Sequence, residues 1–85
     1  MSIEAIWSNL KAHEGEEFFT KTGVAFSYSI NGNILNPSHT DRNIPKSNFV
    51  TALTRFPLYK TTQLRDLQGY AYIYGLLTDK QKRII

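Results

Sequence analysis

Cysteine is absent from this chain, so neither a disulfide nor a thiolate zinc site can stabilise it. Its two histidines, His13 and His39, are far apart in the sequence and belong to no His-x-His or Glu-x-x-His pattern. Metal ions in proteins are usually held by about two to four clustered His, Cys, Asp or Glu side chains. We therefore expect no metal site and no other cofactor.

Long apolar runs are also missing. No stretch approaches the roughly 20 apolar residues that span a bilayer. The start of the chain carries Glu4, its first basic residue is Lys11, and no apolar run follows, unlike a secretory signal. We expect a soluble, cytoplasmic protein that does not engage a membrane.

Catalytic motifs are equally scarce. Ser38, His39 and Asp41 have the residue types of a nucleophilic triad, but adjacent side chains in a loop point apart. The stretch Asn31-Gly32 precedes a predicted strand rather than a helix, so it is not a phosphate-binding loop. The sequence therefore does not predict an enzyme.

What the chain does contain is typical of one small globular domain. It has 85 residues, of which 41% are hydrophobic and 20% are charged. A domain of this size buries only roughly 60–65% of the surface that its unfolded chain exposes. Five tyrosines, five phenylalanines and one tryptophan must therefore supply much of the core.

The first segment is predicted to be a helix over residues 2–13. Its apolar residues recur at helical spacing, at Ile3, Ile6, Trp7 and Leu10. Ser2 is suited to cap the first turn, and Gly15 is suited to a left-handed stop.

Three extended segments follow, at 16–20, 24–30 and 33–36. The middle segment alternates apolar with small or polar residues, which is typical of a half-buried strand. We expect the three segments to form an antiparallel meander.

The Asn31-Gly32 pair is a strong hairpin signal, because both residues tolerate the positive φ angles of a type I′ turn. A turn centred on these two residues would pair Tyr28 with Leu35. Both side chains would then lie on the core face of the sheet.

A polar loop is predicted over residues 36–45, because two prolines and a run of turn formers interrupt regular structure there. A helix over 46–56 and a helical segment over 62–78 follow, the latter broken near Gly69. Residues 70–74 also alternate like a strand, and we favour the helix.

Together these elements predict an α+β domain of order α-β-β-β-α-α, with the helices packed on one face of a three-stranded antiparallel meander. The first five elements resemble the order of double-stranded-RNA-binding domains. The lysine-rich start that this family places on its second helix is replaced here by Pro45-Lys46-Ser47-Asn48. The resemblance is therefore one of topology.

Charge is unevenly distributed along the chain. Residues 1–40 contain two lysines and four glutamates, a net charge of −2, whereas residues 41–85 contain eight lysines or arginines and three aspartates, a net charge of +5. Clustered positive charge attracts anionic partners such as phosphates or acidic protein surfaces. The alternative is that these charges are scattered over a solvated surface.

The loop that precedes the helix at 46–56 is the first candidate binding site. A helix N-terminus attracts anions, and Arg42 and Lys46 flank this one. In the alternative interpretation Asp41 instead pairs locally with Arg42 and Asn43.

Tyrosines interleaved with cations in the last third form the second candidate, since tyrosines can stack bases while cations hold the backbone. We expect a mobile tail at 80–83 to add electrostatic contacts to the nucleic-acid backbone. The candidate nucleic-acid contacts are Arg42, Lys46, His39, Lys60, Arg65, Lys80, Lys82 and Arg83, and the candidate aromatic contacts are Tyr59, Tyr72 and Tyr74.

Three functions follow from these features. The first is a non-catalytic module that contacts nucleic-acid phosphates through its basic C-terminal half. The second, nearly as well supported, is a protein-interaction module or small inhibitor of the phage or mobile-element type. Such a module would use an aromatic surface or an edge strand at 16–20 or 33–36. A homodimer formed through the C-terminal tyrosine segment fits either function.

The third is a metal-independent ribonuclease, in which His39, Arg42, Lys46 and a tyrosine would converge.

Overall fold

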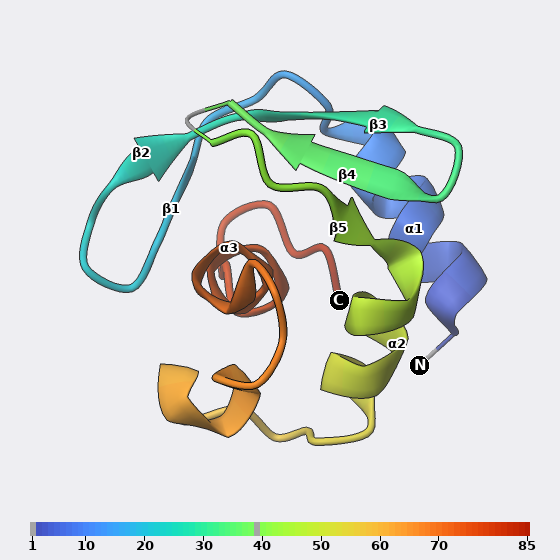
Figure 1. Cartoon of the computed structure of the whole chain (residues 1–85). Coiled ribbons are helices and arrows are strands. Elements are labelled where there is room, and N and C mark those ends of the chain that lie inside the picture. Colours follow the sequence, from blue (N-terminus) through green and yellow to red (C-terminus); the bar gives the residue numbers. More distant parts are fainter. Residues whose placement is uncertain (1, 39) are drawn as a thin grey trace.

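A computed structural model describes residues 2–38 and 40–85. The elements occur in the order α1 (Ile3–Ala12), β1 (Phe18–Phe19), β2 (Ala25–Phe26), β3 (Tyr28–Asn31), β4 (Ile34–Pro37), β5 (Ile44–Pro45), α2 (Lys46–Leu53), η1 (Thr61–Leu64) and α3 (Tyr70–Leu77). Figure 1 shows α3 at the centre, with the strands above it, α2 on one side and the β1–β2 hairpin on the other. The α+β class is confirmed.

Helix α1 forms where the apolar spacing predicts it. The Ser2 hydroxyl accepts a hydrogen bond from the Ala5 amide at 3.4 Å and so caps the first turn. Ile6, Trp7 and Leu10 are buried. The Trp7 indole nitrogen donates to the Gly32 carbonyl at 3.2 Å, which fastens the helix to the tip of the β3–β4 hairpin.

The strands form two antiparallel sheets instead of one meander over residues 16–36. β1 pairs with β2, and β3, β4 and β5 form a separate three-stranded sheet with β4 in the middle. The predicted strand at 24–30 is interrupted at Ser27, which lies between β2 and β3. The predicted edge strand at 33–36 is therefore wrong, because β4 has a neighbour on each side.

The β3–β4 hairpin turns one residue later than the type I′ prediction. Asn31 pairs with Ile34, so Gly32 and Asn33 are the central residues. Gly32 has φ +61° and Asn33 has no positive φ, which is the pattern of a type II′ turn. This moves the partner of Tyr28 from Leu35 to Pro37, a shift of two residues. Since side chains alternate with a period of two, Leu35 stays on the predicted core face.

The loop predicted over 36–45 contains regular structure at both ends. Pro37 ends β4 and Pro45 ends β5. The backbone amide of Ser38 donates to the Ser27 carbonyl, and the backbone amide of Lys46 donates to the Asn33 carbonyl. Because hydrogen-bonded and non-hydrogen-bonded pairs alternate in antiparallel sheets, both prolines fall at positions that need no amide hydrogen.

The last third is helical, as favoured from the sequence. It breaks into η1 and α3 at Gly69, which precedes α3 with φ +76°. Helix α2 is shorter than predicted and stops at Leu53, with Thr54 as its C-cap.

Aromatic rings join these elements into one core. Phe18 from β1 lies between Phe26 and Tyr28, with ring centroids 6.2 and 5.6 Å away. Trp7 and Phe49 meet edge to face at 5.5 Å, which links α1 to α2. No helix among the described residues has the length and apolarity to cross a bilayer.

Candidate functional site

Two adjoining hollows lie on either side of the first residues of α3. The smaller, about 200 Å³, is lined by Thr40, Arg42, Gly69, Tyr70, Ala71 and Tyr72. The larger, about 410 Å³, is lined by Thr20, Lys21, Thr22, Thr61, Tyr70 and Ala71. Tyr70 and Ala71 line both, and we call the two hollows together the α3 groove.

Gly69 places the start of α3 against β5. A β-carbon at this position would lie 2.4 Å from Cδ1 of the buried Ile44, and the positive φ also favours glycine. The Gln68 side chain donates to the Asn43 carbonyl at 2.8 Å. Asn48 of α2 donates to the Gln68 carbonyl at 3.2 Å. These contacts bring the β4–β5 loop, and Arg42 with it, beside α3.

The loop between β1 and β2 forms the opposite wall. The Thr20 amide donates to the Val24 carbonyl at 3.0 Å, and the Val24 amide donates to the Thr20 hydroxyl at 3.1 Å. The hydroxyls of Thr20 and Thr22 are 3.2 Å apart. This loop is therefore closed by its own hydrogen bonds and presents its threonines in a fixed arrangement.

The wall formed by η1 is held in a similar way. The Gln63 side-chain oxygen accepts from the Tyr59 and Lys60 amides at 2.5 and 2.9 Å. Thr61, the first residue of η1, lines the groove. Tyr59 is 70% exposed and Lys60 is also exposed, next to this wall in sequence but outside the lining.

The charged side chains that line the groove are both basic. Lys21 and Arg42 are exposed, one in each hollow, and no acidic residue is among the described residues that line it. The Ala71 amide has no acceptor among the described residues. The N-terminal end of a helix adds partial positive charge. An anion in the larger hollow would lie beside Lys21 and three threonines, and an anion in the smaller hollow would lie beside Arg42 and Thr40.

Arg42 and Tyr72 are the predicted site residues that the structure brings together. Tyr72 is half-buried, and its ring meets Phe26 edge to face at 4.9 Å. Tyr74 is 8% exposed and lies in the core, so the prediction of an aromatic contact there is wrong. Within this tyrosine segment, residues 73–77 are buried and residues 70–72 are half-buried.

Lys46 does not join Arg42 around the start of α2. Its ammonium lies 5.9 Å from the centre of the Trp7 ring, against α1. The ribonuclease hypothesis needs these two residues together, and they contact different elements. Its third member, His39, lies outside the described residues. Within the β4–β5 loop, the Arg42 amide donates to the Thr40 hydroxyl at 3.2 Å.

The C-terminal segment is not the mobile tail that the sequence suggested. Ile84 is fully buried, and its carbonyl accepts from Asn9 of α1 at 3.0 Å. The Lys82 ammonium lies 4.3 Å from the centre of the Phe18 ring and donates to the Glu17 carbonyl. The remaining candidates are exposed outside the groove lining: Arg65, Lys80 and Arg83.

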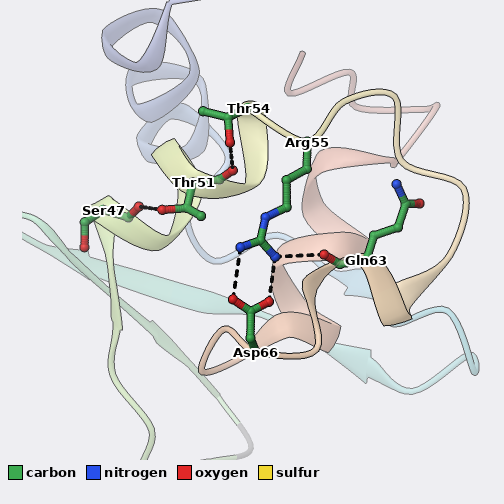
Figure 2. A network of polar contacts seen from close by, with 6 residues as sticks. All are labelled: Ser47, Thr51, Thr54, Arg55, Gln63 and Asp66. Carbon is green, nitrogen blue, oxygen red and sulfur yellow. Dashed lines mark hydrogen bonds and ion pairs between the residues drawn. The ribbon is translucent and has the colours of Figure 1, made fainter.

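Arg55 is also engaged within the fold. Figure 2 shows its guanidinium, just beyond α2, paired with both carboxylate oxygens of Asp66 at 2.6 and 3.0 Å. The same guanidinium donates to the Gln63 carbonyl at 2.8 Å. The hydrogen bond from Arg55 lowers the pKa of the Asp66 carboxyl below its ordinary value.

Sequence reasoning missed Lys21, and within the C-terminal tyrosine segment it selected Tyr72 and Tyr74 as contacts rather than Tyr70. Lys21 belongs to the acidic half of the chain, and its ammonium lies 5.5 Å from the Tyr74 ring centre. The available signal was Gly69, since a helix break there marks the start of α3, whose first residues are only half-buried.

Two other hollows have different linings. One, about 350 Å³ between α1 and α2, is mostly apolar and lined by Ile3, Val50, Leu53 and Thr54. The other, about 360 Å³, lies by β2. No group of three or more metal-ligating side chains occurs within residues 2–38 and 40–85.

Comparison with known proteins does not identify a relative: no family model, curated protein or solved structure matches this chain.

Proposed function

We propose that this domain is a non-catalytic module that binds nucleic acid through the phosphates, and that the α3 groove is its contact surface. The observation that carries the proposal is the position of Lys21 and Arg42. They come from different loops, and each lines a hollow that shares Tyr70 and Ala71 with the other. Cations beside hydroxyl and amide donors are the usual contacts of a phosphate backbone.

The magnitude of binding follows from the number of cations. Two phosphate contacts give a slope of log affinity against log salt of about −1.4 on a single strand and about −1.8 on a duplex. Binding of this type is weak, with a Kd of roughly 1–100 µM at physiological salt. The measurement therefore belongs at low salt, followed by titration upward.

Fluorescence anisotropy with labelled DNA and RNA oligonucleotides tests the proposal. The double variant Lys21→Gln with Arg42→Gln is expected to weaken binding and to flatten the salt dependence. A matched control, Lys11→Gln with Lys80→Gln, removes the same charge from exposed positions outside the lining. Equal losses in the two double variants would assign binding to overall charge, and no binding by the unmodified protein at low salt would refute the proposal.

A protein partner is the second candidate function. The observation that favours it is the apolar hollow between α1 and α2, where Val50 is 42% exposed beside Ile3 and Leu53. A partner bound there would be retained at high salt and lost on the change Val50→Asp. Retention in that variant would exclude this hollow.

A further inference from the structure

The α3 groove is a pair of recessed hollows. The larger hollow, about 410 Å³, is within the range of roughly 300–1,000 Å³ that is usual for small-molecule sites, and the smaller one is below it. A site of this size accepts a compact group. The outer surface of a duplex presents phosphates on a convex cylinder and keeps its bases stacked inside.

Tyr70 is the wall that the two hollows share. It lines both hollows, is half-buried and packs against the core. Lys21 and Arg42 then lie in the hollows on either side. An aromatic wall between two cations matches a strand in which a base is flanked by two phosphates.

Three of the other cations contact groups within the domain. Lys46 lies against Trp7, Lys82 lies against Phe18, and Arg55 is paired with Asp66. All three are half-buried, whereas Lys21, whose ammonium also lies 5.5 Å from the centre of a ring, that of Tyr74, remains exposed. In the groove, two exposed cations lie in hollows that share a half-buried tyrosine.

We infer that the α3 groove selects single-stranded nucleic acid, with one unpaired base stacked against Tyr70 and the adjoining phosphates held by Lys21 and Arg42. This inference rests on the proposed function. A duplex could place a base there only by unpairing it, at a cost of a few kcal/mol that corresponds to a loss of more than about tenfold in affinity.

The test uses a short oligothymidylate with 2-aminopurine at its centre, whose emission falls when the base stacks on an aromatic ring. The probe is compared as a single strand, annealed to its complement, and with an abasic strand of the same length in which every base is missing. The single strand should bind more than about tenfold more tightly than the duplex or the abasic strand, and its emission should be quenched. A free nucleoside monophosphate should bind more weakly than the strand.

Variants locate the stacking. Tyr70→Leu should weaken single-strand binding by about 5- to 150-fold and remove the quenching without changing the salt slope. Tyr70→Phe should retain both properties, because it keeps the ring. The control Tyr59→Leu changes an exposed tyrosine outside the lining and should have no effect.

The outcomes separate this inference from the proposed function. Equal binding of single strand, duplex and abasic strand, all weakened by the Lys21 and Arg42 changes, would overturn the inference and leave the phosphate-binding proposal standing. Tighter binding of the free monophosphate, or loss of quenching in Tyr59→Leu, would also overturn it. If Tyr70→Leu does not fold, Tyr70→Phe and the abasic strand still decide.

Discussion

Replacing Gly75 with alanine tests how closely α3 packs against β1. Gly75 lies inside the helix, and a β-carbon there would lie 2.5 Å from the backbone carbonyl oxygen of Phe19. Ordinary van der Waals contact begins at 3.4 Å, so helix and strand would have to separate by almost 1 Å. The neighbours Phe18 and Leu76 are fully buried, so separation would disturb packing on both sides.

Two effects of opposite sign set the expected change in stability. Alanine is better than glycine in a helix interior by about 1 kcal/mol, which alone would stabilise the protein. Overpacking a core costs about 1–3 kcal/mol. The upper part of this range applies here, because a backbone oxygen moves away less readily than a side chain. We expect a net loss of about 1–2 kcal/mol, which corresponds to a fall in Tm of about 5–15 °C in a domain of this size.

Urea and thermal unfolding followed by tryptophan fluorescence measure this change, because Trp7 is only 3% exposed in the folded state. The matched control is Ser8→Ala, an exposed change in α1 that improves helix propensity without a new contact. A gain in stability for Gly75→Ala, like the gain expected for Ser8→Ala, would refute the close approach of α3 and β1.

Three further predictions concern other parts of the fold. Burial raises the pKa of Tyr28, whose hydroxyl donates to the Leu10 carbonyl at 2.6 Å. Above about pH 10 the unfolded state therefore ionises while the folded state keeps the proton. Urea unfolding should show stability falling by about 1.4 kcal/mol per pH unit, a dependence that Tyr28→Phe removes. Ile84→Ala should cost about 2–5 kcal/mol in the same assay because Ile84 is fully buried, and a change within 0.5 kcal/mol would contradict the docked C-terminal segment. In an NMR titration of the carboxyl groups, the lowered pKa of Asp66 should rise to its ordinary value in the variant Arg55→Gln, and an unchanged value would contradict the pairing.

Local patterns predicted several elements correctly. The apolar spacing of Ile6, Trp7 and Leu10 identified α1, and Gly69 marked the break before α3. The buried face of the β3–β4 hairpin was also predicted correctly. The predicted partner of Tyr28 was wrong by two residues, and a shift by an even number leaves the same side chains on the buried face. These features depend on neighbours in the sequence.

What failed depends on contacts between distant segments. β5 has two residues, and it is a strand because it pairs with Ile34 and Leu35 of β4. Arg42 was assigned to the start of α2 because of its position in the sequence. It lines the α3 groove instead, since Gln68 fastens the β4–β5 loop beside α3.

Four separate segments meet to form the α3 groove: the β1–β2 loop, the β4–β5 loop, the start of η1 and the start of α3. Once the chain unfolds, these segments drift apart and the surface no longer exists. Any compound that occupies it must therefore raise the melting temperature, by an amount equivalent to about 2.7 kcal/mol at a hundredfold excess over its Kd. A thermal-shift screen of nucleotides and short oligomers can thus find the natural ligand class before any binding assay has been built.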